Sequence, residues 1–393
     1  MAITYPKGFL AAGVRAGIKE NGEDIALITS ECPAASAGVF TTNVVKAASV
    51  LVNKGRVSKN STRAIIINSG NANACTGEQG LSDARAMAAE AARLLDVADT
   101  DVLVASTGII GHLMPMEKVI AGIGKAVNAL SRDGESAARA IMTTDTRPKE
   151  ASAEVEIGGV KVRIGGIAKG AGMICPNVAT MLSFITTDAA ITPEMLQKSL
   201  SKSAEISYNC LTVDGDSSTN DSVIILANGM AGNPVIDSPG TNLDSFQKAL
   251  DSVTISLAKQ IARDGEGAKK LIEITVKGTD SFEDARQIAK TIANSPLVKT
   301  AMFGCDPNWG RVLAAAGRAG VGFDLKAVNL YFGDTAMLQK GEPVEFSEVK
   351  VHEVLIGKEV KVLLEVGSGL GAATVWTCDF SYDYVRINAE YHT

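Results

Sequence analysis

The sequence is poor in histidine, proline and aromatic residues. Of 393 residues, three are histidine, 11 are proline and 5% are aromatic. The histidines, His112, His352 and His392, are too far apart in the chain to form a zinc pair one helical turn apart. Neither a histidine-rich metal site nor a Ser–His–Asp hydrolase is therefore expected, and we predict no metal centre.

The sequence also lacks an excess of basic residues, closely paired cysteines and long apolar runs. The net charge of −6 argues against a nucleic-acid binder, which usually carries a basic patch. The six cysteines form no C-x-x-C pair, which is typical of buried thiols in a reducing compartment. No apolar stretch approaches the ~18 residues of a membrane span, and no basic leader precedes an apolar stretch at the N-terminus. We expect a soluble cytoplasmic protein.

Glycine is abundant, with 38 residues, but the sequence patterns that bind phosphate or calcium are not convincing. The P-loop pattern does not occur, and Gly367–Ala372, which has a dinucleotide-loop spacing, leaves too few residues for a βαβ unit. The segment Asp214–Asp221 begins like a calcium loop, but Thr219 and Ile225 stand where glycine and glutamate are needed. We interpret it as a polar turn that lines a site.

Short strand-like runs alternate with amphipathic helical patterns along the whole chain. Gly158-Gly159, between two alternating stretches in 154–167, predicts a hairpin, and the chain after Val328 is mostly strand-like. Strands are also predicted at 63–68, 101–106, 222–227 and 271–276, and helices at 82–95, 116–130, 193–204, 242–262, 282–293 and 307–316. Hairpins mixed with helices favour an α/β sandwich with mixed sheets over a doubly wound parallel sheet.

Three segments could carry chemistry, and the first is Ser106–Gly111, directly after a predicted strand. A hydroxyl beside a glycine at a strand end supplies a side-chain donor and an approachable backbone N–H, which are the components of an oxyanion hole. An ordinary strand-to-helix turn is the alternative.

The third segment, 294–311, is predicted to contain a helix start. Asp306 is predicted to cap a helix whose first residue is Pro307.

The second segment, Lys169–Ile185, fits an N-terminal nucleophile. Glycines, a Pro-Asn turn and the small Ala179 lead to Thr180, and an apolar run follows. If the bond between Ala179 and Thr180 were cut, Thr180 would carry both a hydroxyl and a free α-amine. An α-amine has an ordinary pKa near 8, so it can accept the hydroxyl proton without a histidine.

Together these residues closely resemble the ornithine acetyltransferase family, also called glutamate N-acetyltransferases, of arginine biosynthesis. Seven segments match in the family's order and span nearly the whole chain: 106–108, 141–146, 169–182, 264–268, 294–300, 304–311 and 388–393. The resemblance implies a fold like that of the N-terminal-nucleophile and aminopeptidase proteins, and a precursor that cuts itself between Ala179 and Thr180. The products would be an α chain, 1–179, and a β chain, 180–393, assembled as α2β2.

The resemblance also implies the activity and the residues that perform it. Family members transfer acetyl from N2-acetyl-L-ornithine to L-glutamate with no cofactor, and some also use acetyl-CoA, which leaves acetyl-CoA open as a second substrate. Thr180 matches the nucleophile, and Thr107 and Gly108 match the oxyanion hole. The positions that match substrate-binding residues are Thr143, Lys169, Thr180, Glu266, Asn388 and Thr393. Spacing leaves Thr144 open beside Thr143, and Cys175 stands where many relatives carry histidine.

Two alternatives remain at this point. An N-terminal-nucleophile aminopeptidase or amidase of similar fold would share the self-cut threonine but deliver the acyl group to water. A non-catalytic, uncleaved binding protein belongs to a different class. Transfer of the acetyl group to glutamate, and not to water, would distinguish an acetyltransferase from the first alternative. Two fragments, and not one full-length chain, would distinguish it from the second.

Overall fold

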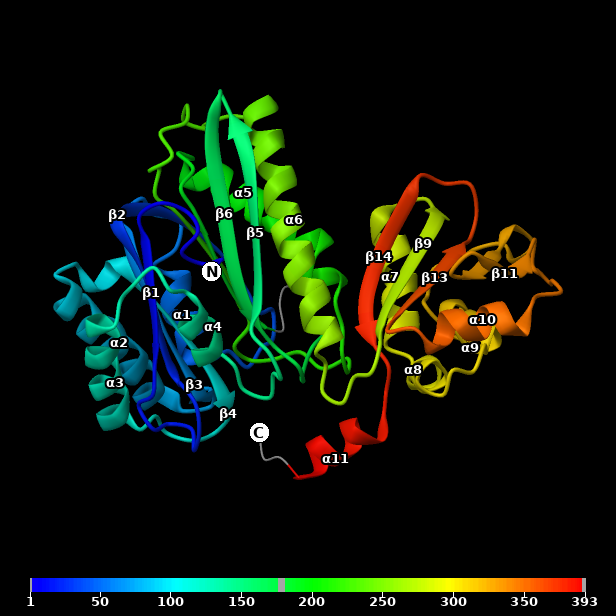
Figure 1. Cartoon of the computed structure of the whole chain (residues 1–393), viewed down its shortest axis with the longest axis horizontal. Coiled ribbons are helices and arrows are strands. Elements are labelled where there is room, and N and C mark those ends of the chain that lie inside the picture. Colours follow the sequence, from blue (N-terminus) through cyan, green and yellow to red (C-terminus); the bar gives the residue numbers. More distant parts are fainter. Residues whose placement is uncertain (1, 176–180, 391–393) are drawn as a thin grey trace.

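The chain forms two lobes that lie side by side (Figure 1). The structure is a computed structural model, and it describes residues 2–175 and 181–390. The larger lobe contains an eight-stranded sheet and the smaller, C-terminal lobe a six-stranded sheet. The predicted cleavage bond, its residues Ala179 and Thr180, and Thr393 lie outside the described residues.

The sheet of the larger lobe folds back on itself into two layers because of the long strand β2 (Ile25–Phe40). The first part of β2 pairs with β1 and β3, and its last part, from Ala35, pairs with β8. Pro33, which has no N–H for the ladder, lies where the pairing shifts register. The strands along the sheet are β4 (Val102–Ile109), β3 (Thr62–Asn71), β2, β8 (Ser222–Ala227), β7 (Leu182–Thr187), β6 (Val160–Lys169) and β5 (Lys149–Ile157), with β1 (Phe9–Val14) beside β2.

Alternating side chains of these strands fill three apolar layers. In β3, Ile65 and Ile67 face the core between the two sheet layers, while Ile66 faces the helices outside. In β8, Ile224 belongs to that central core, and Ile225 to the core beneath the helices of the other side. Because side chains alternate along a strand, both faces of each layer are apolar and both must be covered.

Helices cover the two outer faces and complete a four-layer α/β sandwich (Figure 1). The first sheet layer is covered by α1 (Ala48–Lys54), α2 (Gly77–Leu95) and α3 (Met116–Asn128), and the second by α5 (Pro193–Ile206) and α6 (Thr241–Arg263). The short helix α4 (Glu135–Ala140) packs against β1 and β2. Thr192 caps α5 by accepting a hydrogen bond from the Met195 backbone N–H, with Pro193 at the first helical position.

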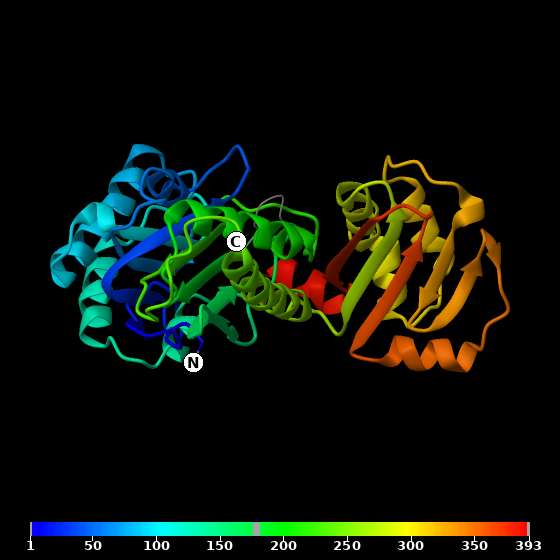
Figure 2. The same cartoon turned by 90° about the horizontal axis from the view of Figure 1, so that it is seen from above.

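The smaller lobe has a mixed sheet of its own. Its strand order is β12 (Glu342–Pro343), β11 (Thr335–Gln339), β10 (Asn329–Phe332), β13 (Glu359–Glu365), β9 (Leu271–Thr279) and β14 (Gly371–Cys378). Four helices belong to it: α7 (Phe282–Ala293), α8 (Pro296–Phe303), α9 (Trp309–Gly317) and α10 (Glu348–Ile356). After β14 the chain returns as α11 (Tyr382–Glu390), which lies between the lobes in Figure 2.

The fold confirms the predicted hairpin and corrects two predictions about helices. The predicted hairpin forms as β5 and β6, with positive φ at both Gly158 and Gly159, which suits a type I′ turn. The predicted helix start at Asp306 and Pro307 is wrong: α9 begins at Trp309, and the Asn308 side chain caps it by accepting from the Arg311 N–H. The strand-like interpretation of the chain after Val328 missed α10 and α11. Among the described residues, no helix is long and apolar enough to cross a membrane.

Candidate active site

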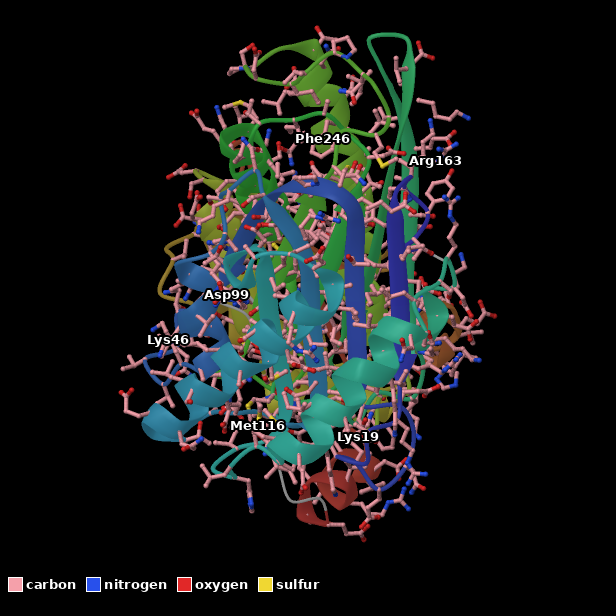
Figure 3. All side chains as sticks on the ribbon, turned by 90° about the vertical axis from the view of Figure 1, so that its left-hand side faces the viewer. Lys19, Lys46, Asp99, Met116, Arg163 and Phe246 are labelled. Carbon is pink, nitrogen blue, oxygen red and sulfur yellow. The ribbon has the colours of Figure 1, made fainter. Side chains whose placement is uncertain are left out.

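A cavity of about 330 Å³ lies at the end of the sandwich where α11 reaches the larger lobe. It is lined by the end of β4, the loop after α4, the end of β6, the start of β7, the loop before β8, the turn after α6 and α11. Figure 3 shows this end at the bottom, where Lys19 is labelled, while Phe246 lies at the opposite end. Lys19 Nζ donates to the Met142 carbonyl, next to the cavity residue Thr143, so the lower end of that view is the site.

Thr107 and Gly108 lie where β4 ends, beside the parallel strand β3. Gly108 has a φ of +133°, and a Cβ there would come within 2.4 Å of the Gly70 carbonyl carbon. Only glycine fits, because both the backbone conformation and the contact with β3 exclude a side chain. With the Gly108 backbone packed against Gly70 of β3, the peptide that joins Thr107 and Gly108 lies at the wall of the cavity.

Lys169, the last residue of β6, joins two threonines across the cavity. Its Nζ donates to Thr107 Oγ1 at 3.1 Å and to Thr143 Oγ1 at 2.7 Å. Each hydroxyl accepts from the ammonium, so each keeps its own proton to donate elsewhere. Thr144 also lines the cavity, but it is Thr143 that contacts Lys169. Burial lowers the pKa of Lys169, and the charge of Asp145 opposes that shift.

A buried ion cluster fixes the backbone around Lys169. Lys149 Nζ lies 2.5 Å from Asp145 Oδ1 and 2.6 Å from Asp264 Oδ2, and its side chain is fully buried. Asp145 Oδ1 also accepts from the Gly170 N–H at 2.6 Å. Burial alone would raise the pKa of Asp145, but the charges of Lys149 and Lys169 hold it well below its usual range. No role was predicted from the sequence for Asp145, Lys149 or Asp264.

Replacing Lys149 with methionine is expected to destabilise the fold by about 3–5 kcal/mol, because two carboxylates stay buried without their cation. Because the pKa of Asp145 is lower in the folded state than in the unfolded state, the ionised carboxylate stabilises the fold at neutral pH. That stabilisation is lost as the pH falls below about 4. Denaturant unfolding at pH 7 and at lower pH measures both effects. The control is Lys161→Met, whose exposed pair with Glu154 should contribute about 0–1 kcal/mol; equal losses in the two variants would contradict the prediction.

Glu266 and Asn388 meet on the side of the cavity formed by α11. Asn388 Nδ2 donates to Glu266 Oε2 at 2.8 Å, and the Glu266 backbone N–H donates to the Ala171 carbonyl at 2.8 Å. A Cβ on Gly172 would lie 2.4 Å from the Glu266 carboxylate, so the absence of a side chain there makes room for it. Residues 122 positions apart in the chain thus form one polar wall.

The loop before β8 supplies polar groups to the cavity, and none of them was predicted individually from the sequence. Asp214 accepts from the backbone N–H groups of Met173 and Ile174 at 2.7 and 2.8 Å, and burial raises its pKa. Asn220 Nδ2 donates to the carbonyls of Ala72 and Ser106. The interpretation of 214–221 as a polar turn lining a site is confirmed. Among the described residues, no group of three or more histidine, cysteine or acidic side chains could hold a metal ion.

The structure brings together six of the residues predicted from the sequence, and they lie in one cavity: Thr107, Gly108, Thr143, Lys169, Glu266 and Asn388. Ala179, Thr180 and Thr393 lie outside the described residues. Met181 and Leu182, which follow Thr180 in the chain, line the same cavity. The position of the missed acidic residues in the sequence could have pointed to them. Asp145 and Asp264 lie in segments that match the family, and Asp214 begins the polar turn predicted to line a site.

Comparison with known proteins identifies the family. The model of the ArgJ family matches residues 10–393. The chain belongs to the ArgJ family. A protein of Symbiobacterium thermophilum named arginine biosynthesis bifunctional protein ArgJ is 53% identical over all of this chain and 98% of its own length. A protein of the same name from Dehalococcoides mccartyi is 50% identical over all of this chain and 97% of its own length. The resemblance seen in the sequence is confirmed, and with it the expectation of an arginine-biosynthesis enzyme.

A solved structure supports the fold as well. The crystal structure of arginine biosynthesis bifunctional protein argJ from Bacillus halodurans is 44% identical and has a TM-score of 0.53. It matches 54% of this chain and 100% of that chain. The predicted α/β class with mixed sheets is confirmed by this similarity and by the two mixed sheets of the present ArgJ family member.

Proposed function

We propose that this ArgJ family member transfers the acetyl group of N2-acetyl-L-ornithine to L-glutamate through an acetyl ester of Thr180. The observation that carries the proposal is the cavity in which Lys169 holds the hydroxyls of Thr107 and Thr143 while Glu266 lies on the wall formed with α11. A cation and an anion in one small cavity suit an amino-acid substrate, which offers a carboxylate and an ammonium group.

The proposed reaction is a two-step acyl transfer. The Thr180 hydroxyl attacks the acetyl carbonyl, its proton passes to the α-amine of the same residue, and a tetrahedral oxyanion forms. Thr107 Oγ1 and the Gly108 N–H are the proposed donors to that oxygen. The carbon–nitrogen bond then breaks, the proton goes to the leaving amine, and ornithine departs. The α-amine of glutamate attacks the ester in the second step and restores Thr180.

The substrate-binding roles proposed for the other residues follow from their charge and position. Lys169 is suited to a substrate carboxylate and Glu266 to a substrate ammonium, with Asn388 holding the Glu266 carboxylate in place. Thr143 orients Lys169. Thr393, three residues beyond α11, is the further binding position proposed from the family resemblance.

The self-cleavage belongs to the same proposal. Cutting between Ala179 and Thr180 creates the α-amine that the reaction uses, and it produces chains 1–179 and 180–393, which we propose assemble as α2β2. The reaction as written needs no metal or organic cofactor, because the base and the nucleophile are on one residue.

Assays with and without acceptor test the function. Purified protein is incubated with N2-acetylornithine, and ornithine and N-acetylglutamate are measured by mass spectrometry in the presence and absence of glutamate. We expect N-acetylglutamate to form in step with ornithine only when glutamate is present. Release of free acetate at the same rate without glutamate would instead identify an amidase. A third reaction, with acetyl-CoA and glutamate, determines whether acetyl-CoA is a second donor.

A further inference from the structure

The helix α11 carries a residue of the cavity wall but has no apolar face that fixes it in place. None of the residues of α11 is buried, yet Asn388 donates from Nδ2 to Glu266 Oε2 at 2.8 Å. Helices in proteins are stabilised chiefly by the packing of an apolar face. The position of Asn388 therefore depends on how the chain is held just before α11 begins.

The segment 377–380, which leads into α11, is held by a buried lysine of α8. Lys299 is 1% exposed, and its Nζ donates to Thr377 Oγ1 at 2.7 Å and to the Cys378 carbonyl. The Phe380 N–H donates to the Lys299 carbonyl at 3.3 Å, and Lys299 Nζ lies 4.5 Å from the centre of the Phe380 ring. One residue of α8 thus contacts three residues of the segment.

A lysine in these surroundings is costly to bury, because its hydrogen bonds go to a hydroxyl and a carbonyl and not to a carboxylate. Burial lowers the pKa of Lys299, and the neighbouring Cys378 and Asp379 only partly oppose that shift. The ammonium and the neutral amine both carry at least two protons, so either form donates both hydrogen bonds. An apolar side chain would fill the same space at lower cost, so the two hydrogen bonds need an explanation beyond packing.

A continuous path of contacts joins Phe380 to the wall of the cavity. The rings of Phe380 and Tyr384 are stacked, with centres 4.7 Å apart and planes 17° apart. Tyr384 lines the cavity, and its carbonyl accepts from Asn388 Nδ2 at 3.0 Å. The two protons of that amide nitrogen therefore serve Tyr384 and Glu266. A displacement of Phe380 would move Asn388 away from Glu266.

The chain entering α11 also contacts the turn after α6, which carries Glu266. Ser381 Oγ donates to the Gly267 carbonyl at 2.6 Å, and Asp379 Oδ1 accepts from the Lys269 N–H at 2.8 Å. These contacts hold the start of α11 against the turn, while the contacts from α8 hold it against the smaller lobe.

We propose that Lys299 is a positioning residue for substrate binding, which holds 377–380 so that Asn388 stays in contact with Glu266. The inference rests on the proposed function, in which Glu266 binds the substrate ammonium. Lys299 does not line the cavity, so it acts only through α11. It should therefore change KM for N2-acetylornithine and leave the chemical step nearly unchanged.

Lys299→Met tests this assignment, because methionine keeps an unbranched side chain and removes both hydrogen bonds. We expect KM for N2-acetylornithine to rise about tenfold with kcat within about threefold, since a hydrogen bond to a charged group is misaligned. Lys270→Met is the matched control. Lys270 is also buried in the smaller lobe and donates to the carbonyls of Met302, in α8, and Leu355, in α10. Its loss should lower stability and leave KM within about twofold.

A double-mutant cycle with Asn388→Ala separates positioning from a general loss of structure. Asn388→Ala alone should raise KM, and Lys299→Met should then raise it by less than about twofold more, because the residue through which Lys299 acts is gone. Effects on KM that multiply, or a Lys299→Met variant with KM within twofold of the wild type, would overturn the assignment. Should Lys299→Met fail to fold, Phe380→Leu, which removes the ring stacked on Tyr384, replaces it in the cycle with the same expectation.

Hydrogen exchange of the α11 amides gives a readout that needs no activity. Lys299→Met should speed exchange over 382–390 relative to both the wild type and Lys270→Met. Equal exchange in the two variants would refute the role of Lys299. Absence of acetyl transfer by the wild type would instead reject the proposed function, and the exchange measurement would still decide whether Lys299 holds α11.

Discussion

Replacing Thr180 with alanine is expected to leave one uncut chain of 393 residues that transfers no measurable acetyl group. The variant lacks the hydroxyl that attacks the Ala179 carbonyl during processing and the acetyl carbonyl during turnover. Both losses follow from one atom, so they should occur together. Intact mass gives the state of the chain, and the N2-acetylornithine and glutamate assay gives the activity.

Thr180→Ser is the matched control, because serine keeps a hydroxyl on the same carbon. We expect it to cut itself and to retain part of the activity. If Thr180→Ala still yielded two fragments and turned over, Thr180 would be neither the nucleophile nor the residue that cuts the chain. An uncut but active alanine variant would separate processing from catalysis and reject only the acetyl ester.

Replacing Thr107 with valine is expected to lower kcat by about 10²–10³-fold with little change in stability. Thr107 Oγ1 accepts from Lys169 at 3.1 Å, so its own proton is free to reach the oxyanion. Valine keeps the shape of the side chain and removes that donor. Because the donor acts on the charged intermediate, kcat should fall much more than KM rises.

Steady-state kinetics and thermal unfolding of Thr107→Val are the measurements. Thr107→Ser keeps the hydroxyl and should stay within about tenfold of the wild type. A valine variant with nearly normal kcat would show that Thr107 only supports Lys169. In that case Thr143, the other hydroxyl on Lys169, would become the next residue to substitute.

The local structure of several segments was predictable because short-range rules decide it. Gly158-Gly159 between two alternating stretches predicted the turn of the hairpin formed by β5 and β6. Helices whose ends carry no distinctive turn residues give no comparable local signal in the sequence. The helix α10 was missed because the chain after Val328 also contains alternating apolar residues, and burial of Val351 and Leu355 in the core of the smaller lobe selects the helix. The helix α11 was missed because it buries none of its described residues and so has no apolar stripe to recognise.

The start of α9 shows the limit of capping rules. Asp306 and Pro307 favour a helix start, but Asn308 is an equally good cap and lies two residues later. The Asp306 N–H donates to the Ala301 carbonyl at the end of α8, a contact that the sequence gives no means to foresee. This hydrogen bond holds Asp306 in the C-terminal turn of α8, so Asn308 and not Asp306 caps α9.

The sequence by itself determined the family and the residues that match its motifs, because both depend on residue identity and order. Only the tertiary structure decided that Lys169 contacts both Thr107 and Thr143, and that Glu266 meets Asn388. It also decided that Lys149 pairs with two buried carboxylates, and that Asp221 Oδ2 accepts no hydrogen bond from the residues that the structure describes. These contacts join residues far apart in the chain, and their strength depends on burial, which a linear sequence does not specify.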